Sequence, residues 1–397
     1  MLKPNTHYSE LKDTYLFNTI YRKTNEYLSE NPDKKVFGMG VGDMSLPLCN
    51  AVIEALHNAV DDQGNAATFH GYMPEIGDKS LRCAIRDYYK NMGAAVSENE
   101  IFVSSGACDD LCDILELFDK DNTVMVIEPA YPEYVDTNIL AGRKIIHIAA
   151  GEKNSFLPSP GKEAEADILY ICSPNNPTGA AFSRNELQAW VDFANEIGAV
   201  ILFDAAYEIF IEDKNIPHSI YELEGADRCA IEICSLSKTA GFTGTRLGYT
   251  VVPRNLVRAG MNLNEMWSRN RETRTNGVSY ILQKGALAVF TPEGQKQIHE
   301  NLKVYKENAS YFMEALDTAG IWYCGGKNSP YIWMKCPDGM SGWEFFDYLL
   351  EKVQVVGIPG DGFGECGKGY FRFSTFGNPE ETKEAARRLC GLLKKEQ

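Results

Sequence analysis

The stretch SLSKTAGFTGTRLG, residues 235–248, places a lysine beside groups that suit an anion. Lys238 follows the apolar run AIEICSLS, where a buried strand is expected to end, and burial lowers the pKa of an amine toward the neutral form that makes a Schiff base. Eight residues later Arg246 offers a fixed fork of donors to a phosphate, and the hydroxyls of Ser235 and Ser237 lie by the same loop. The pattern predicts a reactive amine next to an anion site. The alternative is a lysine that extends to solvent beside an ordinary glycine turn.

Polar side chains also follow the other apolar runs, and open α/β sheets bind their ligands at such positions. Asp204 ends the run AVILFD, and a buried carboxylate there needs a cationic partner, for which a protonated ring nitrogen or an arginine would serve. Tyr207, three residues later, can reach the same ligand, and Asn176 follows the run DILYIC. Tyr131 in EPAYPEY offers a stacking face for a ligand, or simple packing beside two prolines.

A second candidate anion site opens the helical pattern of SSGACDDLCDILELF, residues 104–118. The free N–H groups and the dipole at the start of a helix favour an anion, so the backbone of Ala107 and Cys108 is expected to face a phosphate. A plain turn between a strand and a helix explains the same residues.

Together these motifs resemble the pyridoxal-phosphate enzymes of the class I and II aminotransferases, which have the aspartate-aminotransferase fold, or fold type I. SPNNPTG, DAAYE and SLSKTAGFTGTRLG occur in the order and spacing of that family, and the resemblance covers nearly the whole chain. It implies that pyridoxal 5′-phosphate is the cofactor, that Lys238 forms the internal aldimine and that Asp204 pairs with the pyridinium nitrogen. Tyr207 and Asn176 would bond the ring hydroxyl, and Tyr131 would stack on the ring. The implied phosphate ligands are Ser235, Ser237, Arg246 and the backbone of Ala107 and Cys108.

Other segments resemble one branch of that family, the LL-diaminopimelate aminotransferases. They are LKDTYLFNTI, GVGDMSLPLC, GYMPEIGDKSLRCAI, YPEYVDTNILAGRK and TRTNGVSYILQKGA. In that branch several counterparts of the residues that line the substrate pocket come from the partner subunit, which implies a homodimer with shared active sites. The corresponding residues here are Tyr15, Gly42, Tyr72, Glu75 and Asn276.

Arg372 in GYFRFSTFG matches the arginine that binds the substrate α-carboxylate in these enzymes, and the resemblance gives Asn176 a share in substrate binding. By position alone, an arginine that alternates with aromatic residues is also typical of the exposed face of an edge strand.

Cys108 departs from the branch, which usually reads Ser-Asp-Gly-Ala-Lys where this chain reads Ser-Ser-Gly-Ala-Cys. The lysine of the branch helps to bind the distal end of the substrate, and a thiol cannot replace an ammonium that faces a carboxylate. Either another cation compensates or the enzyme prefers another amino donor, and Cys108 itself is either a reactive thiol at a helix start or a spectator. The cations that could compensate are Lys79, Arg269, Arg271 and Arg274.

The leading prediction is an aminotransferase that acts on LL-diaminopimelate with 2-oxoglutarate as acceptor, in lysine biosynthesis. Lys238, once displaced by the substrate amine, would carry a proton from Cα to C4′, and amination of a second substrate would complete a ping-pong cycle. Alternatives on the same fold are an aminotransferase for aspartate-type or aromatic donors and a β-elimination lyase. A non-catalytic sensor is disfavoured because Lys238, Asp204 and Arg372 are all present.

Short apolar runs between about residues 100 and 252, separated by helix-length connections, must position these side chains. They are rich in Val and Ile and predict an α/β fold with a mostly parallel seven-stranded sheet between helices. One connection, residues 183–198, has Ser183 and Glu186 spaced as in a capping box and stops at Gly198. Its apolar positions at helical spacing are Leu187, Trp190, Val191 and Ala194.

A smaller α+β domain is expected at the C-terminus. It begins with a long amphipathic pattern from Thr291 to Ala319 and continues with strand-like segments at SPYIWMKC and GYFRFSTFG. The first forty residues lack clear periodicity and indicate an arm. We therefore predict an arm at 1–40 that contributes to the small domain and the dimer, a large cofactor-binding domain at 41–285 and a small domain at 286–397.

The 397-residue chain has 39 basic and 55 acidic residues, a net charge of −16, which disfavours general attraction to nucleic acid or anionic membranes. Eleven cysteines lie mostly in apolar stretches without the spacing of zinc sites, which indicates reduced thiols and no metal centre. No apolar run approaches the roughly 18 residues that span a bilayer, and the start lacks the apolar core of a signal peptide. These features predict a cytoplasmic enzyme whose partners are a small amino acid and a 2-oxo acid.

Overall fold

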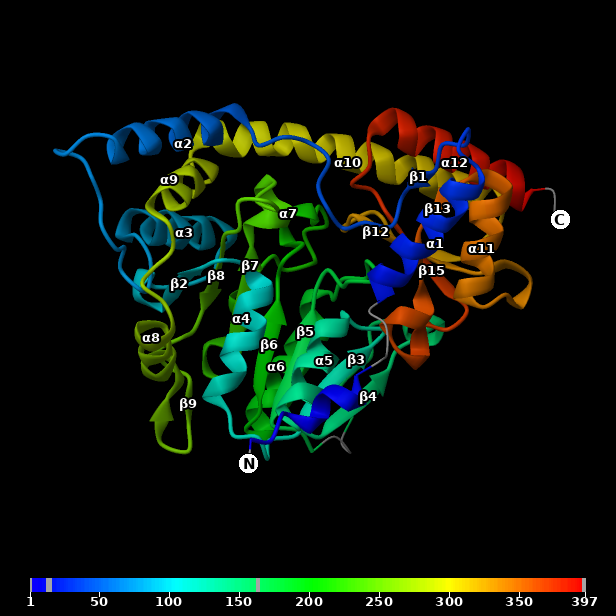
Figure 1. The fold of residues 1–397 in the computed structure, drawn as a ribbon. Helices are drawn as coiled ribbons and strands as arrows, with labels where there is room; N and C mark the ends of the chain where they lie inside the picture. The colour runs from blue at the N-terminus through cyan, green and yellow to red at the C-terminus, as the bar shows by residue number, and fades with distance from the viewer. Residues whose placement is uncertain (1, 12–15, 162–164, 395–397) are drawn as a thin grey trace.

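Seven strands form the central sheet of the protein (Figure 1). The structure is a computed structural model that describes residues 2–11, 16–161 and 165–394 of the chain. The strands are β2 (Ile101–Ser104), β3 (Val124–Glu128), β4 (Ile145–Ala149), β5 (Ile168–Cys172), β6 (Val200–Asp204), β7 (Ala230–Ser235) and β8 (Gly248–Val251). Their order across the sheet is β2-β8-β7-β6-β5-β3-β4. All run parallel except β8, which pairs antiparallel with β2 and β7. The predicted mostly parallel seven-stranded sheet is confirmed.

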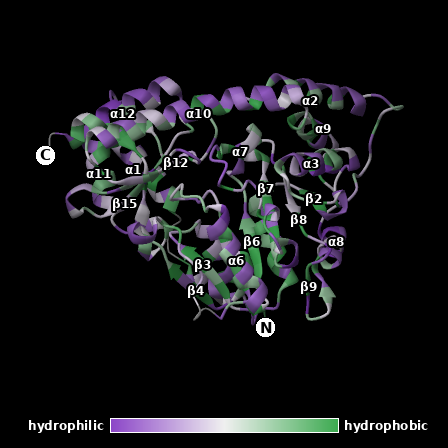
Figure 2. Cartoon of the chain, turned by 180° about the vertical axis from the view of Figure 1, so that it is seen from behind, coloured by the Kyte–Doolittle hydropathy of each residue, from purple (hydrophilic) through white to green (hydrophobic). Residues whose placement is uncertain are grey.

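Alternate residues of a strand pack on opposite faces of this sheet. In β5, Leu169 and Ile171 belong to one hydrophobic cluster, whereas Ile168 and Tyr170 belong to another on the other face. Both faces are therefore covered, and β5, β6 and β7 are buried along their whole length. This is why their sequences are continuous apolar runs rather than alternating ones. Figure 2 shows the result, with β6 and β7 coloured mainly as hydrophobic.

The helix α6 (Arg184–Ile197) forms as its sequence predicts. The Ser183 hydroxyl accepts a hydrogen bond from the Glu186 amide at 3.4 Å, and the Glu186 carboxylate accepts one from the Ser183 amide at 2.8 Å. Gly198 ends the helix in the left-handed region with φ of 77°. The four apolar residues predicted to face the sheet are buried; they are Leu187, Trp190, Val191 and Ala194.

Several further helices surround the sheet. α2 and α9 pack against each other, and a small hairpin of β9 and β10 precedes α8. Their bounds are α2 (Asn50–Gln63), α3 (Lys79–Met92), α4 (Ala107–Asp113), α5 (Pro132–Ala141), α7 (Leu236–Ala240), β9 (Val257–Arg258), β10 (Met261–Asn262), α8 (Leu263–Arg274) and α9 (Tyr280–Val289).

A second, smaller unit has its own sheet and core. Its strands, in the antiparallel order β11-β12-β15-β14, are β11 (Tyr323–Gly325), β12 (Tyr331–Lys335), β15 (Tyr370–Ser374) and β14 (Ile358–Pro359). Its helices are α10 (Pro292–Thr318), α11 (Gly342–Val353) and α12 (Pro379–Leu393). Thr291 caps α10 and Ala319 ends it, so the predicted long helix is confirmed, as is the α+β character of this part of the chain. In Figure 1, α10 runs along the top from α2 and α9 to α12 and so joins the two units.

The first forty residues contain a helix that the sequence pattern did not indicate. In α1 (Leu16–Glu30) only Leu16 and Ile20 are buried, against the core of the smaller unit, so the apolar stripe is too short to recognise. β1 (Phe37–Gly38) then pairs in parallel with β13 (Val355–Val356). The exact domain boundaries remain a prediction. No helix in the described ranges is both long and apolar enough to cross a membrane.

Candidate functional site

A pocket of about 410 Å³ lies at the edge of the sheet where most of the predicted site residues meet. Because β2, β3, β5, β6 and β7 all point the same way, their carboxyl ends share this edge. The smaller unit supplies another wall through β12 and β15. The predicted residues that line the pocket are Gly42, Ala107, Cys108, Tyr131, Asn176, Asp204, Tyr207, Ser235, Ser237, Lys238, Arg246 and Arg372.

Lys238 lies in α7, the short helix that follows β7, and is half-buried in the pocket. Its Nζ donates a hydrogen bond to the carbonyl oxygen of Gly42. Burial lowers the pKa of Lys238 to about 8; the charges of Arg372 and Arg246 act in the same direction, whereas that of Asp43 opposes them. An appreciable fraction of this amine is therefore neutral near neutral pH, as a lysine that forms a Schiff base requires.

Asp204 is a buried carboxylate at the end of β6, only 6 % exposed. One oxygen accepts a hydrogen bond from the Tyr134 hydroxyl at 2.6 Å, and the other accepts one from the Ala206 amide at 3.0 Å. Burial raises the pKa of Asp204 against these two donors, and no lysine, arginine or histidine in the described part of the chain pairs with it. The cationic partner expected from the sequence is therefore not an arginine of the fold.

Arg246 borders the pocket next to two serine hydroxyls and the first turn of α4. Its Nη1 donates to Ser237 Oγ at 3.1 Å, and among the described residues no acidic side chain pairs with it. A Cβ atom on Gly106 would lie 2.5 Å from Arg246 Nη2, so only glycine leaves space for the guanidinium. Ser235 caps α7, since its Oγ accepts from the Ser237 amide at 3.2 Å. A guanidinium with unused donors beside hydroxyls and a helix start fits a phosphate.

Arg372 is 1 % exposed and has no carboxylate partner in the described ranges. Its Nη1 donates to Asn176 Oδ1 at 2.5 Å and its Nη2 to the Gly40 carbonyl at 2.8 Å, while its buried Nε has no hydrogen-bond partner. Burial lowers the pKa of Arg372. β15 lies between β12 and β14, so the alternative of an exposed face on an edge strand is wrong. A carboxylate bound in the pocket would supply the missing negative charge.

Two tyrosines of the site were not foreseen from the sequence. Tyr134 donates to Asp204, and the hydroxyl of Tyr331, from β12, lies 2.7 Å from that of Tyr207. Both occur among apolar and aromatic neighbours, where packing is the ordinary explanation. The one available signal was chemical, because a buried tyrosine hydroxyl needs a hydrogen-bond partner.

Three of the predicted substrate residues do not line the pocket of this chain. Tyr72 is 89 % exposed, and Glu75 and Asn276 are exposed as well. They lie in adjacent loops, because a Cβ atom on Gly277 would lie 2.3 Å from the Met73 carbonyl oxygen. They therefore form one exposed cluster outside the pocket. Tyr15 lies outside the described residues.

The cations considered as substitutes for the missing lysine do not line the pocket either. Arg271 is buried in an ion pair with Asp113 at 2.9 Å, whereas Arg269 and Arg274 pair with Glu272 and Glu116 on the surface. Lys79 is exposed at the start of α3. Cys108 does line the pocket, and a hydrogen bond with Cys112 lowers the pKa of the Cys108 thiol.

Comparison with known proteins matches residues 34–389 to the family model of aminotransferase class I and II. The LL-diaminopimelate aminotransferase of Lachnospira eligens is 48 % identical over 405 aligned positions, which cover 99 % of this chain and 100 % of that protein. The LL-diaminopimelate aminotransferase of Lawsonia intracellularis is 45 % identical, with the same coverage. Among solved structures, the L,L-diaminopimelate aminotransferase of Chlamydomonas reinhardtii has a TM-score of 0.93 at 38 % identity and covers 98 % of each chain. The resemblance stated from the sequence, and the predicted fold class, are confirmed.

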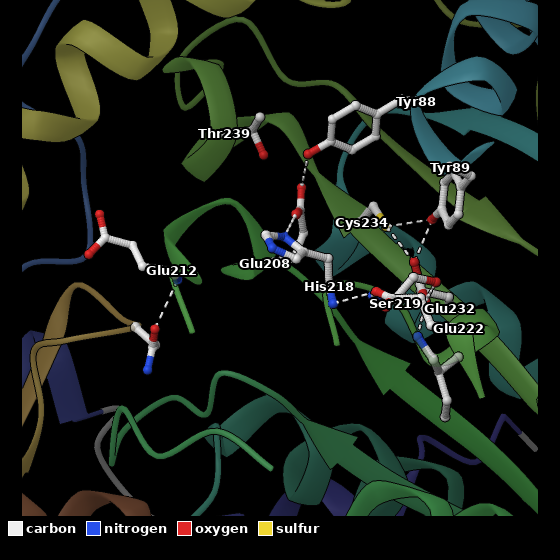
Figure 3. Close-up of polar contacts among 12 residues, drawn as sticks. Tyr88, Tyr89, Glu208, Glu212, His218, Ser219, Glu222, Glu232, Cys234 and Thr239 are labelled. Carbon is white, nitrogen blue, oxygen red and sulfur yellow. Dashed lines mark hydrogen bonds and ion pairs between the residues drawn. The ribbon is translucent and has the colours of Figure 1, made fainter. Parts of the chain in front are cut away.

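A buried polar network includes residues of β7, the strand that leads to Lys238 (Figure 3). Glu232 of β7 is 1 % exposed and accepts hydrogen bonds from the Tyr89 hydroxyl at 2.5 Å, the Ser219 hydroxyl at 2.7 Å and the Ile220 amide at 2.9 Å. Burial raises the pKa of Glu232 to about 7 in spite of these donors.

Glu208 forms the second half of this network, directly after Tyr207 in the chain. It accepts hydrogen bonds from the Tyr88 hydroxyl at 2.9 Å and from Nδ1 of His218 at 3.1 Å (Figure 3). The network thus holds β7 itself and the segment that follows β6, and these two strands lead to Lys238 and Asp204.

Glu232→Gln is expected to change how stability depends on pH. The folded protein holds a proton on Glu232 up to about pH 7, above the ordinary carboxyl pKa of 4.5, so this stabilisation is complete below pH 4.5 and is lost as the pH rises through 7. Glutamine does not ionise, so the stability of the variant lacks this pH dependence. Between pH 5 and 8 the melting temperature of the wild type should therefore fall relative to that of the variant, by an amount equivalent to on the order of 3 kcal/mol of unfolding free energy. Thermal melts at both pH values measure it, with the exposed Glu212→Gln as control. A constant difference between wild type and variant would contradict the prediction.

Proposed function

The chain belongs to the class I and II aminotransferases, and we propose that it transfers an amino group from LL-diaminopimelate to 2-oxoglutarate with pyridoxal 5′-phosphate as cofactor. The observation that carries the proposal is the set of unbalanced charges in the pocket. Asp204 is a buried carboxylate without a cation, and Arg246 and Arg372 are guanidiniums without a carboxylate in the described part of the chain. A protonated ring nitrogen, a phosphate and a substrate carboxylate would balance these three groups, and Lys238 would meet the aldehyde.

The residues present fit the cofactor. Asp204 would face the ring nitrogen, and Tyr207 and Asn176 would face the ring hydroxyl, with Tyr131 against the ring. A Cβ atom on Gly248 would lie 2.7 Å from the Cys234 carbonyl oxygen and 3.0 Å from the amide nitrogen of Ala107, so glycine there lets β8 approach the start of α4 closely. The proposed phosphate ligands are Ser235, Ser237, Arg246 and the backbone of Ala107 and Cys108.

The cofactor supplies an electron sink for the electron pair that deprotonation leaves at the substrate Cα. Arg372 binds the α-carboxylate and so orients the Cα–H bond toward the amine of Lys238. Lys238 takes the proton from Cα and returns it at C4′, for which its lowered pKa suits it. Asp204 keeps a proton at the facing ring nitrogen, because a buried carboxylate without another cation favours the charged ring.

The substrate assignment is supported by relatives that cover this chain from end to end. The Lachnospira eligens and Lawsonia intracellularis relatives named above are LL-diaminopimelate aminotransferases at 45–48 % identity. We propose a homodimer in which the exposed cluster of Tyr72, Glu75 and Asn276 enters the pocket of the partner, since the cluster has no access to the pocket of its own chain. All eleven cysteines are free, which fits a reducing compartment, and we propose the cytoplasm.

One observation favours a second candidate, an aminotransferase for a donor without a distal carboxylate. Cys108 stands in the pocket where the branch has a lysine, and no compensating cation from the described part of the chain lines the pocket. A half-reaction screen decides between the donors by following the visible absorbance of the bound cofactor as single amino acids are added. Stoichiometric glutamate from 2-oxoglutarate identifies transfer, whereas ammonia and pyruvate from a β-substituted amino acid would identify a lyase and overturn the proposal.

Lys238→Ala is expected to abolish covalent attachment of pyridoxal phosphate, because the variant has no amine at this position. Borohydride reduction followed by peptide mass spectrometry should label Lys238 in the wild type and nothing in the variant. Turnover should fall by at least ~10²- to 10⁴-fold with the loss of the proton carrier. A label on another lysine at wild-type yield would remove Lys238 from this role.

Asp204→Ala is expected to fold but to lose roughly 10²- to 10³-fold in kcat, because nothing then keeps the ring nitrogen protonated. Stability should hold or rise, since the substitution removes a buried carboxylate whose pKa is raised by burial. Steady-state kinetics and a thermal melt measure both effects. Near-normal kcat would refute the assignment of Asp204.

Cys108→Lys is expected to lower the KM for diaminopimelate by roughly tenfold, because a charge-assisted bond to the distal carboxylate is regained. Cys108→Gln provides a control of similar length without the charge. A higher KM in the lysine variant alone would mean that another group already binds the distal end.

A further inference from the structure

Tyr331 lies at the junction of the two units, between two residues of the pocket. It comes from β12 of the smaller unit and is 1 % exposed. Its hydroxyl lies 2.7 Å from that of Tyr207, and the two rings meet edge to face with centroids 5.0 Å apart. The guanidinium carbon of Arg372 lies 4.3 Å from the centre of the Tyr331 ring. One side chain thus contacts both the residue expected at the ring hydroxyl of the cofactor and the residue expected at the substrate carboxylate.

Gly42 packs closely against the Tyr331 hydroxyl and leaves no room there for a side chain. A Cβ atom at Gly42 would lie 2.6 Å from that hydroxyl oxygen, so a larger residue would displace it. The carbonyl of Gly42 also accepts the hydrogen bond of Lys238. Gly42, which binds the amine of Lys238 through its carbonyl oxygen, therefore lies directly against the Tyr331 hydroxyl.

The direction of the bond between the two tyrosines follows from the proposed function, on which this inference rests. If Tyr207 donates its proton to the ring oxygen of the cofactor, its own oxygen is left to accept a hydrogen bond. Tyr331 is the group within reach, so its hydroxyl donates to Tyr207. A bond accepted by Tyr207 polarises its O–H group and strengthens the bond that it donates.

We propose that Tyr331 is a positioning residue that transmits carboxylate binding at Arg372 to the hydrogen bond between Tyr207 and the cofactor ring. The charge of Arg372 over the ring makes the Tyr331 hydroxyl a stronger donor. A carboxylate bound to Arg372 offsets that charge, weakens the donation along both tyrosines and leaves the ring oxygen more basic.

The charged groups around Tyr331 affect the pKa of its hydroxyl in the way that this proposal requires. Burial raises the pKa of Tyr331, and the charge of Arg372 opposes the rise, as does the hydrogen bond with Tyr207. The other ionisable groups that face Tyr331, Cys172 and Asp204, both act to raise the pKa. Arg372 is therefore the cation whose neutralisation has the largest effect on this hydroxyl.

The test is the pH titration of the visible absorbance of the bound cofactor, which needs no turnover and whose apparent pKa rises with the basicity of the ring oxygen, because that oxygen shares the titrating proton with the Schiff-base nitrogen. A bond donated to that oxygen lowers the apparent pKa of the transition, so Tyr331→Phe should raise it by about 0.5 and Tyr207→Phe by about 1 or more. The double variant should match Tyr207→Phe alone, because Tyr331 acts through Tyr207. The control is Tyr221→Phe, which removes a hydroxyl that donates to the backbone carbonyls of Ala230 and Val251 far from the pocket and should leave the absorbance unchanged.

A second measurement uses pimelate, a dicarboxylate without amino groups, as the ligand of Arg372. Saturating pimelate should raise the pKa of the wild-type absorbance, and the rise should be smaller in Tyr331→Phe, in which only the path through Asn176 remains. If Tyr331→Phe does not fold, Tyr331→Met removes the same hydroxyl while it keeps an apolar side chain in the core, and the same shift is expected.

The outcomes separate this inference from the function on which it rests. An unshifted pKa in Tyr331→Phe, or a further equal shift when it is added to Tyr207→Phe, overturns the role of Tyr331 and leaves the aminotransferase intact. A wild-type protein that takes up no pyridoxal phosphate overturns the proposed function itself.

Discussion

The buried carboxylate of Asp204 is the constraint around which the pocket is organised. A charge at the end of a fully buried strand is costly unless it is paired, yet its two donors here, Tyr134 and the Ala206 amide, are neutral. β6 lies in the middle of the sheet, and the strands on both sides of it hold the carboxylate in place in spite of the cost of burial. A cation that pairs with Asp204 in this buried position would gain a strong electrostatic interaction with it.

The positive side of the pocket is organised by different means. Arg246 comes from a glycine loop of the larger unit, whereas Arg372 comes from the central part of the sheet in the smaller unit. Each is held by neutral acceptors rather than by carboxylates, Arg246 by Ser237 and Arg372 by Asn176 and the Gly40 carbonyl. Burial lowers the pKa of Lys238 and the charges of the two guanidiniums lower it further, so anions bound at both of them would also change the protonation of that amine. Binding and proton transfer are coupled because all these groups share one buried space.

The sequence predicted the elements whose periodicity is strong and the residues that follow them. Buried parallel strands are continuous apolar runs, and Asp204 and Lys238 follow two of them, so both the sheet and the location of the pocket could be inferred. The helix α1 could not, because only Leu16 and Ile20 of this helix are buried. Tyr331 could not either, because its position in SPYIWMKC is explained equally well by packing, and its partner Tyr207 is 124 residues away in the chain. Contacts between the two units depend on tertiary geometry that leaves no local pattern.

Recognition at the far end of the substrate follows from the charges that remain once the cofactor is bound. In the proposed complex a phosphate on Arg246 and an α-carboxylate on Arg372 would use both guanidiniums of the pocket, and Cys108 supplies no further positive charge. The exposed cluster that a partner chain would bring contains Glu75 with Tyr72 and Asn276, an acid with two neutral hydrogen-bonding groups. Such a set suits an ammonium better than a carboxylate. In the proposed dimer, the replacement of lysine by Cys108 would therefore shift the discrimination of a symmetric diamino diacid from its distal carboxylate to its distal ammonium.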